Sequence, residues 1–525
     1  MRRSRLLPVL LAAALGIAAC SSGGSIQSAG NTTTRPASTD TASTDAPSAG
    51  TDSPGNTDST APGDTAAPDT EPATTEAPST TIATPLDDLP TCPTDALASV
   101  TEPVQITFWH GMTADNEKVL TELTDRYNAS QDKVEVVLQN QGGYEQALDK
   151  YLQSGQDSRP ELLQSPEYAV QVLRDTDSFV PVQACAESDG FDTTPLLTGA
   201  TNAYSTGGVQ WAMPFNVSNP VLFYNKKIFA AAGLDPEQPP KTLEEIQQYS
   251  QQIVDSGAAK YGLVIDTDFD GGGGWYIEQW FAKDQAFYAD NENGRSAPAS
   301  KVLFDGPTGV GLYTFLQGAV ASGVVYNVGD NTSGQDTFLK LADTSEPGAM
   351  TIGTSAALGT VLAAIDAGIA PLIAKDDIGV SQMPGPNGSP TVLIGGASLW
   401  IAADKGDTRT AATWDFVKFL SSAESQSEWS ARTGYVPIRE DATTVDPLKT
   451  TYSTDPRFAV AFESLLATPD EPTAIGALLG PQREIRVLTA RALAEVLGGS
   501  DVKTSLTNAA TQANSLLAEY ASRNL

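Results

Sequence analysis

The sequence predicts an α/β fold of two lobes that follows an export segment and a long linker. Segments with strand periodicity and segments with helix periodicity alternate from about residue 100 onward. The folded body of about 430 residues exceeds a comfortable single hydrophobic core, which favours two lobes. Residues 21–90 contain no aromatic residue and are mostly Ser, Thr, Pro, Ala, Gly and Asp. They therefore lie outside the folded body.

The first twenty residues indicate export and attachment to a membrane. Three arginines within the first five residues precede an apolar stretch, Leu6 to Leu15, which is too short to cross a bilayer about 30 Å thick as a helix. We interpret residues 1–19 as a signal peptide. The ending Ile-Ala-Ala-Cys at Cys20 resembles a bacterial lipobox, which implies lipidation of Cys20 and cleavage before it. An ordinary signal peptide followed by an incidental cysteine is the alternative.

Residues 20–90 are expected to form a disordered tether. They cannot bury enough apolar surface to offset the entropy lost on ordering. A flexible chain of about 70 residues has a root-mean-square reach of roughly 40–50 Å. The tether would lift the folded body off a membrane that holds two acyl chains of the lipidated N-terminus.

The composition excludes several classes of protein. The 31 Lys and Arg stand against 64 Asp and Glu, for a net charge of −33, so clustered cations for nucleic acid are lacking. One His and three Cys argue against a zinc enzyme, and we expect neither metal nor cofactor. A catalytic Cys–His pair is not expected where the only His is His110. Cys92 and Cys185 are predicted to form a disulfide, with two separately buried thiols as the alternative.

The body begins with a strand–helix–strand unit. Residues 104–108 alternate apolar and polar side chains, residues 113–128 place Leu120, Leu123 and Tyr127 on one helical face, and residues 134–138 form a second strand. Short connections of this kind imply parallel strands. Further strands are expected at 221–224, 261–265, 349–352, 392–394 and 397–402, and helices at 243–256, 308–322, 409–420, 482–497 and 502–522, the last capped by Ser500.

Ligands of open α/β sheets bind at the carboxyl ends of the strands, so two such lobes would face one another across a cleft. We assign residues 91–216 plus 377–420 to the first lobe. Residues 217–376 plus 421–525 are assigned to the second.

Six segments of the body carry a family resemblance. They are residues 106–112, 143–145, 216–226, 394–400, 433–438 and 484–486. They read Ile-Thr-Phe-Trp-His-Gly-Met, Gly-Tyr-Glu, Asn-Val-Ser-Asn-Pro-Val-Leu-Phe-Tyr-Asn-Lys, Ile-Gly-Gly-Ala-Ser-Leu-Trp, Thr-Gly-Tyr-Val-Pro-Ile and Glu-Ile-Arg. Together they resemble the extracellular solute-binding proteins of ABC importers, and among these the glycerol-3-phosphate-binding branch. Each is weak alone, but they appear in family order along nearly the whole body.

The resemblance implies a two-lobe periplasmic-binding-protein-like fold with a hinge and an interlobe cleft. It implies a monomer without enzymatic activity that delivers a small polar solute to the permease of an importer. The solute would be glycerol-3-phosphate-like or a glycerophosphodiester, and a mono- or oligosaccharide is the alternative. A carbohydrate-active hydrolase and a surface adhesin are the rival classes. The protein would be anchored to the outer face of the cell membrane through Cys20.

The resemblance also implies a set of ligand-binding residues. They are Tyr144, Glu167, Ser218, Trp275, Thr354 or Ser355, Gly396, Tyr435 and Arg486. An Arg guanidinium and hydroxyl groups bind phosphate oxygens, and an ionised Glu accepts hydrogen bonds from glycerol hydroxyls. Glycine lets a backbone N–H approach the ligand, and Trp275 would form an aromatic wall. A second Trp of some members falls within Gly271–Gly274 here, which suggests a wider pocket.

These residues also have structural interpretations. Tyr144 and Tyr435 are typical of interface packing, and Arg486 is equally a candidate to pair with an acid in so acidic a protein. Gly395 and Gly396 have a purely structural alternative, in which they ease the entry of the chain into a strand. Trp109 is expected in the core, and His110 as a hydrogen-bonded structural residue.

Residues 266–271, Asp-Thr-Asp-Phe-Asp-Gly, begin like a calcium-binding EF-hand loop. That loop needs a bidentate Glu at its twelfth position, where Ile277 stands. We therefore expect an acidic surface loop without calcium.

Overall fold

The computed structural model describes residues 89–370 and 373–524. The predicted signal peptide, the predicted lipidation residue Cys20 and nearly all of the predicted tether lie outside the described residues. No helix within the described ranges is both long enough and apolar enough to span a bilayer.

The first sheet has the order β2-β1-β3-β13-β4, with β7 paired to β13. Its strands are β1 (Val104–His110), β2 (Val134–Asn140), β3 (Leu162–Pro166), β4 (Phe179–Val180), β7 (Met213–Ser218) and β13 (Gly395–Ala402). Strands β1, β2 and β3 are parallel, and β13 runs antiparallel to β3, β4 and β7. The predicted strand–helix–strand unit is therefore confirmed, with α1 (Ala114–Ser130) between β1 and β2.

The second sheet has the order β10-β9-β11-β8-β12. Its strands are β8 (Pro220–Asn225), β9 (Tyr261–Ile265), β10 (Val325–Asn327), β11 (Gly348–Thr354) and β12 (Ile378–Gln382). Strand β9 is parallel to β10 and β11, whereas β8 is antiparallel to β11 and β12. Strands β5 (Ser205–Thr206) and β6 (Val209–Gln210) form a separate small hairpin.

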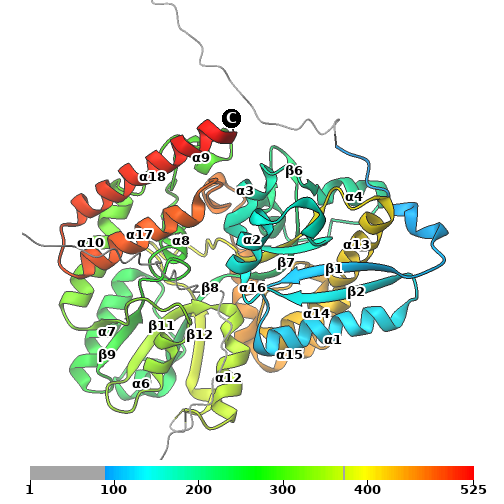
Figure 1. Cartoon of the computed structure of the whole chain (residues 1–525). Helices are drawn as coiled ribbons and strands as arrows, with labels where there is room; N and C mark the ends of the chain where they lie inside the picture. The colour runs from blue at the N-terminus through cyan, green and yellow to red at the C-terminus, as the bar shows by residue number, and fades with distance from the viewer. Residues whose placement is uncertain (1–88, 371–372, 525) are drawn as a thin grey trace, which may run out of the picture. The chain divides into compact units, whose positions relative to one another are not determined.

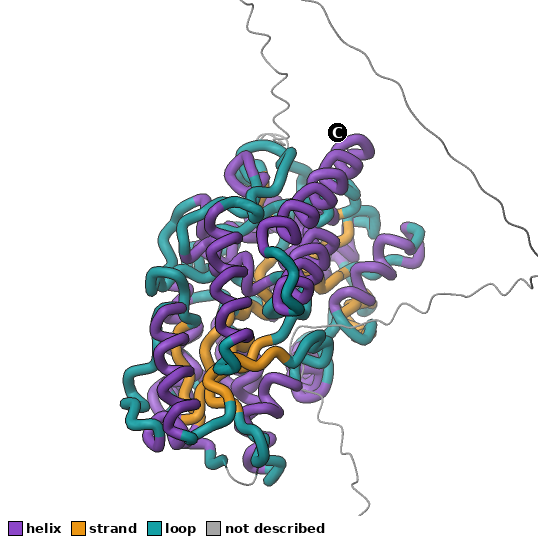
Figure 2. Tube along the Cα trace, turned by 90° about the vertical axis from the view of Figure 1, so that its left-hand side faces the viewer, coloured by secondary structure: helices purple, strands orange, loops and turns teal. Residues whose placement is uncertain are grey.

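Helices cover the strands, which lie in the interior (Figure 2). The other α-helices are α2 (Tyr144–Gln153), α3 (Val170–Arg174), α4 (Val182–Asp189), α5 (Thr198–Ala203), α6 (Lys226–Ala231), α7 (Leu243–Ser256), α8 (Trp275–Lys283), α9 (Asp290–Gly294), α10 (Pro307–Ala321), α11 (Asp336–Leu341), α12 (Leu358–Asp366), α13 (Asp407–Leu420), α14 (Ala423–Thr433), α15 (Leu448–Thr454), α16 (Val460–Leu466), α17 (Gln482–Leu497) and α18 (Val502–Asn524). Short 3-10 helices are η2 (Thr94–Ser99), η3 (Gln156–Ser158), η4 (Glu167–Ala169), η5 (Ser355–Ala357), η6 (Lys375–Asp377), η7 (Glu440–Thr444), η8 (Pro456–Ala459) and η9 (Pro472–Ala474).

Local signals explain where several elements begin. Helix α7 has the predicted bounds because Thr242 and Glu245 form a capping box, each side chain bonding the other's backbone N–H. Helix α18 begins as predicted, but Asp501 rather than Ser500 caps it, since the Asp501 Oδ1 accepts the Thr504 N–H at 2.9 Å.

One predicted strand is wrong. Residues 392–394 pair with no strand, because side chains take their backbone N–H groups: Val392 N donates to Thr468 Oγ1 at 3.0 Å, and Leu393 N donates to Gln279 Oε1 at 2.8 Å.

The buried apolar side chains form two cores, one around each sheet. The chain passes from the first sheet to the second between β7 and β8, and returns between β12 and β13. Helices α17 and α18 pack together and against α10 (Figure 1). Two segments differ from the predicted lobe ranges. Strand β12 pairs with β8 of the second sheet, and Trp429 of α14 and Phe462 of α16 are buried in the first core.

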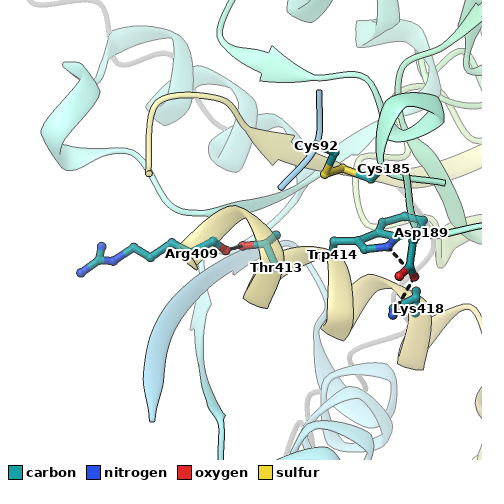
Figure 3. The surroundings of a disulfide bond; sticks show 7 residues. All are labelled: Cys92, Cys185, Asp189, Arg409, Thr413, Trp414 and Lys418. Atoms are coloured by element: carbon teal, nitrogen blue, oxygen red, sulfur yellow. Dashed lines mark hydrogen bonds and ion pairs between the residues drawn. A yellow bond between two sulfur atoms is a disulfide. The ribbon is translucent and has the colours of Figure 1, made fainter. Parts of the chain in front are cut away.

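A disulfide joins Cys92 to Cys185 where the chain enters the first core (Figure 3). Cys185 lies on α4, whose last residue, Asp189, accepts a hydrogen bond from Trp414 Nε1 at 3.1 Å. The Asp189 carboxylate also pairs with Lys418 Nζ at 2.8 Å, so α4 is held on α13 at two points. The first residues that the structure describes are therefore fixed to the first core by a covalent bond.

Replacing both cysteines by alanine should lower the free energy of unfolding by about 2–4 kcal/mol, because the bridge closes a long loop and restricts the unfolded chain. Urea denaturation of the mature body would measure the loss. Dithiothreitol should destabilise the wild type by a similar amount and leave the double variant unchanged. A double variant as stable as the oxidised wild type would contradict the prediction.

Candidate functional site

Three buried polar side chains meet where the chain crosses from β7 to β8. Ser218 is the last residue of β7 and pairs with Gly395 at the start of β13. The indole ring of Trp275 lies directly on Gly395, since a Cβ there would overlap the ring. The Ser355 N–H donates to the carbonyl oxygen of Asn219, the residue after Ser218, at 3.0 Å. A strand pairing, a ring contact and a backbone hydrogen bond therefore tie Ser218, Trp275 and Ser355 to the same crossing between the two sheets.

The polar atoms of these three side chains have no hydrogen-bond partner among the described residues. They are the hydroxyl oxygens of Ser218 and Ser355 and the Nε1 of Trp275. Buried polar groups in proteins are almost always hydrogen-bonded, and each one left unpaired costs about 1–3 kcal/mol. Trp275 Nε1 only donates, and a serine hydroxyl donates or accepts. Three such groups at one crossing make this a candidate site for a ligand with acceptor atoms.

The structure distinguishes between Thr354 and Ser355, which the sequence left as alternatives. The Thr354 Oγ1 accepts the Ala356 N–H at 3.3 Å and thereby caps η5. The Ser355 hydroxyl has no such local partner. Ser355 is thus the residue with a hydroxyl available to a ligand, whereas Thr354 contributes to the wall of a neighbouring pocket.

Tyr144 and Tyr435, both nominated from the sequence, lie together. Tyr144 begins α2 and Tyr435 follows α14, and their hydroxyl oxygens are 3.2 Å apart. Asn216 of β7 donates from Nδ2 to the Tyr144 hydroxyl and accepts from Gln164 Nε2 at 2.8 Å. Both tyrosines are buried, and Tyr435 also stacks on Trp429. Asn216, which binds the Tyr144 hydroxyl, lies two residues before Ser218 on β7. The packing of the two tyrosines and this link to β7 fit both interpretations of these residues.

Gly396 has a backbone conformation and a close contact that require glycine. Its φ is +88°, in the left-handed region, and a Cβ there would overlap the carbonyl oxygen of Asn216 on β7. The following residue, Ala397, pairs with Pro166, which immediately precedes Glu167. Gly396 therefore brings β13 onto β7 and sets Glu167 beside the site.

Arg486 is the only predicted site residue with a cationic side chain, and two of its three nitrogens are hydrogen-bonded or ion-paired at short distance to acids. The residue is 2 % exposed, and its Nε and Nη2 donate to the two oxygens of Glu278, each at 2.8 Å. Nη2 also lies 2.9 Å from Glu167 Oε1. Nη1 lies 3.6 Å from Asp270 Oδ1 and makes no hydrogen bond with any described residue. In this structure Arg486 therefore pairs with acids, as its structural interpretation expected.

Three carboxylates face the single guanidinium of Arg486, and burial shifts the pKa of two of them. Burial raises the pKa of Glu167, although the Arg486 charge opposes the rise. Burial raises the pKa of Asp270 well above its usual range, and the Glu167 charge adds to it. Burial lowers the pKa of Arg486, but the charges of Glu278 and Glu167 outweigh it and hold the pKa well above its usual range. Arg486 stays charged while Glu167 and Asp270 take up protons more readily than exposed acids.

Sequence reasoning missed Glu278 and Asp270 as parts of this site. Glu278 follows Trp275 by three residues on α8, a spacing that places both side chains on one helical face. Asp270 belongs to the acidic motif that was interpreted as a surface loop. That interpretation is wrong, because Asp266 and Asp268 are only 5 % and 4 % exposed.

The acidic loop is folded inward by its own first residue. The Asp266 Oδ1 accepts the N–H groups of Asp268 at 3.0 Å and of Gly272 at 2.7 Å. Glycine at 272 is needed because a Cβ there would overlap the Asp266 carbonyl oxygen. Across the described ranges, no group of three or more His, Cys, Asp or Glu is arranged to hold a metal ion.

Trp109 and His110 take part in none of the contacts described above. Trp109 is buried, as expected, and its Nε1 donates to Gln139 Oε1 at 2.9 Å. Burial lowers the pKa of His110 to about 4, so it is neutral at physiological pH. The hydrogen bond expected of His110 is missing at Nδ1, which has no partner in the part of the chain that the structure describes.

Comparison with known proteins gives both a family and a fold. The family model described as bacterial extracellular solute-binding protein matches residues 122–460. The chain is 29 % identical to the sn-glycerol-3-phosphate-binding periplasmic protein UgpB of Escherichia coli strain K12, over 79 % of this chain and 93 % of the relative. The same protein of Pectobacterium atrosepticum is also 29 % identical, over 79 % of this chain and 91 % of the relative.

Two solved structures share the fold at low sequence identity. UgpB from Mycobacterium tuberculosis in complex with glycerophosphocholine superposes with a TM-score of 0.65 at 20 % identity, covering 79 % of this chain and 99 % of that one. A cyclic α-maltosyl-1,6-maltose binding protein from Arthrobacter globiformis superposes with a TM-score of 0.63 at 22 % identity, with the same coverage. Proteins with this fold thus bind ligands as different as a phosphodiester and an oligosaccharide.

Replacing Gly396 by alanine should lower the free energy of unfolding by more than about 3 kcal/mol, because a left-handed backbone and a clash with the β7 backbone act together. Chemical denaturation would measure it. The control is Gly208→Ala, since Gly208 has a φ of +78° but no atom within 4 Å of a Cβ. That variant should lose only about 1 kcal/mol. Equal losses of stability in the two variants would contradict the prediction and show that the β7 backbone shifts to make room for the added methyl group.

Proposed function

The chain belongs to the bacterial extracellular solute-binding protein family, and on this premise we propose that it captures a glycerol-3-phosphate-like or glycerophosphodiester solute for an ABC importer. Family membership, the two-lobe α/β fold and the assignment to transport rather than catalysis are confirmed by the matches. The hydrolase alternative is therefore set aside. The choice of ligand is our proposal.

The observation that carries this proposal is the group of unpartnered buried atoms at Ser218, Ser355 and Trp275. A phosphate ester presents several oxygen acceptors within a small volume, and two hydroxyls and one indole N–H can donate to them together. The hydrogen bonds would be made to a charged acceptor, for which each is worth about 1.5–3 kcal/mol. These neutral donors can therefore bind the ester without any cationic side chain besides Arg486.

The remaining predicted residues would surround the ester. The Trp275 ring would form a wall, and the hydroxyl pair of Tyr144 and Tyr435 would meet the glycerol part. Glu167, with one oxygen on Arg486, offers the other as an acceptor for a glycerol hydroxyl. Arg486 would contribute through Nη1, the nitrogen that makes no hydrogen bond with the described residues.

Charge favours a diester over a monoester. Glu278 occupies two N–H groups of Arg486 and Glu167 a third, so the guanidinium charge is already compensated. A phosphate monoester would bring two negative charges at neutral pH into a site with surplus carboxylates, whereas a diester brings one. The net charge of the whole chain, −33, also disfavours a doubly charged ligand.

A neutral sugar is the second candidate ligand. The surplus of carboxylates over Arg486 and the aromatic surface of Trp275 suit sugar hydroxyls and the apolar face of a sugar ring. The likeness in fold to a maltosyl-binding protein supports this candidate.

Capture would follow from closure of the two lobes about a hinge. Contacts already cross between them: Arg483 of α17 pairs with Glu145 and Asp149 of α2, each at 2.9 Å. Closure of this type around a solute is within the known repertoire of periplasmic binding proteins. The closed protein, a monomer tethered through a lipid on Cys20 to the outer face of the membrane, would then deliver the solute to its permease.

Ser218→Ala and Ser355→Ala should each weaken the binding of glycerol 3-phosphate or glycerophosphocholine about tenfold or more. Neither should destabilise the unliganded protein, because each hydroxyl lacks a partner there. Titration calorimetry and chemical denaturation would measure the two effects, with maltose as the neutral-sugar arm.

The matched control is Ser427→Ala. The buried Ser427 Oγ donates to Val445 O at 2.8 Å and accepts from Leu448 N at 3.0 Å. This variant should lose about 1–3 kcal/mol of stability and keep its affinity. Binding of maltose but of no phosphate ester would refute the proposed ligand class and favour the second candidate.

Cys20→Ser should release the protein from cell membranes into the soluble fraction, because lipidation requires the thiol. Fractionation and immunoblotting would show it, with Ser21→Ala as the control that keeps the anchor. A Cys20→Ser protein that stays with the membranes would contradict the proposed anchor.

A further inference from the structure

We propose that Arg483 and Tyr520 are positioning residues, which hold the two lobes together from outside the ligand site and thereby set the affinity for the solute. A lobe here means one core with its sheet and the helices packed on it. Both side chains belong to the second lobe and bond carboxylates of the first. The inference rests on the proposed function in one respect, because it assumes that the solute is captured when the lobes close.

The first of these contacts joins α17 to α2 through Arg483. Helix α17 buries Ile485 in the second core, whereas α2 buries Leu148 in the first. The Arg483 Nη2 donates to Glu145 Oε2 and its Nη1 donates to Asp149 Oδ1, each at 2.9 Å. A planar guanidinium can bind two acceptors at once, which the point charge of a lysine does less well. One side chain of the second lobe therefore bridges two acids of the first.

The two acids on α2 need the charge of Arg483. Glu145 and Asp149 are four residues apart on one helix, a spacing at which like charges repel each other. Glu145 is 6 % exposed, and burial raises its pKa while the Arg483 charge opposes the rise. Burial lowers the pKa of Arg483, but the charges of Glu145 and Asp149 outweigh it and raise that pKa. Separating the lobes would remove this compensation, so the contact favours the closed arrangement.

The second contact joins α18 to the end of α3 through Tyr520. The Tyr520 hydroxyl donates to Asp175 Oδ2 at 2.6 Å. Asp175 directly follows α3, which buries Leu173 in the first core, whereas α18 buries Leu517 in the second. The Tyr520 ring lies on Gly480, two residues before α17, where a Cβ would overlap the ring. Packing thus fixes the ring, and the hydroxyl makes the hydrogen bond to the other lobe.

Tyr168 of the first lobe connects these contacts with the ligand site. Its hydroxyl donates to Glu145 Oε1 at 3.2 Å, and the Arg486 Cζ lies 5.2 Å from the centre of its ring. Tyr168 directly follows Glu167, which pairs with Arg486. Arg483 and Arg486, three residues apart on α17, therefore reach adjacent groups of the first lobe. The solute and the outer contacts favour the same closed arrangement, so losing a contact lowers the apparent affinity.

Tyr520→Phe removes one hydroxyl from the second contact and keeps the ring. In small-angle X-ray scattering the unliganded variant should have a larger radius of gyration than the wild type. It should bind glycerol 3-phosphate, glycerophosphocholine or maltose, whichever the wild type binds, about fivefold more weakly. The matched control is Tyr127→Phe, because the Tyr127 hydroxyl donates to Asp415 Oδ2 at 2.7 Å between α1 and α13 of the first lobe. That variant should keep both the radius and the affinity of the wild type.

Asp149→Lys sets a like charge against Arg483 and should weaken binding of the same solute about tenfold, measured by titration calorimetry. Its matched control is Glu122→Lys. The Asp149 and Glu122 side chains are 47 % and 45 % exposed, and Glu122 pairs with Arg432 at 2.6 Å within the first lobe. The control should leave the affinity unchanged. Added salt should weaken binding more in the wild type than in Arg483→Gln, because screening removes an attraction that the variant lacks.

The outcomes separate the inference from the proposed function. Wild-type radius and affinity in both Tyr520→Phe and Asp149→Lys would overturn the inference and leave the proposed function standing. Equal losses of affinity in these variants and in their controls would also overturn it. A wild type that binds none of the three solutes would overturn the proposed function, while an expanded Tyr520→Phe protein would still support the positioning role. Thermal melting would verify that each variant is folded.

Discussion

The buried ion pair of Arg486 with Glu278 is the interaction on which the site depends. It fixes α17 on α8 within the second core, and the contact from Nη2 to Glu167 extends the same guanidinium to η4 beside the first sheet. A charge at 2 % exposure persists only when it is paired, and removing one partner of such a pair is strongly destabilising. Trp275, Glu167 and Asp270 take their positions around this centre.

The same constraint explains the chemistry that the site can offer a ligand. A guanidinium that is bound by carboxylates is a positioning group with one remaining nitrogen, not an isolated anion receptor. The uncommitted binding capacity lies instead in neutral donors at Ser218, Ser355 and Trp275. Leaving such donors buried and unpaired lowers the stability of the unliganded protein, and a ligand that satisfies them recovers that free energy. The same hydrogen bonds would then contribute both to ligand affinity and to the closure of the two lobes.

Much of the fold could be predicted because it rests on local patterns. The Thr242–Glu245 capping box starts α7, and the spaced apolar residues of α1 bury one helical face. The prediction failed at residues 392–394, where the distant side chains of Gln279 and Thr468 take the backbone N–H groups. It failed again for the acidic loop, because inward folding by Asp266 depends on the glycines that follow.

By itself, the sequence determined the alternation of strands and helices and the resemblance to solute-binding proteins, and through that resemblance it nominated a set of ligand-binding residues. These properties follow from the periodicity of apolar residues and from short sequence motifs. Only the tertiary structure decided that Arg486 is paired with Glu278 across 208 positions, that Ser355 rather than Thr354 has an uncommitted hydroxyl, and that Asp268 and Asp270 line a pocket. The reason is physical. Ion pairing, burial and unpaired hydrogen-bonding groups arise from contacts between distant segments, and those contacts exist only after the two sheets and α17 have packed together.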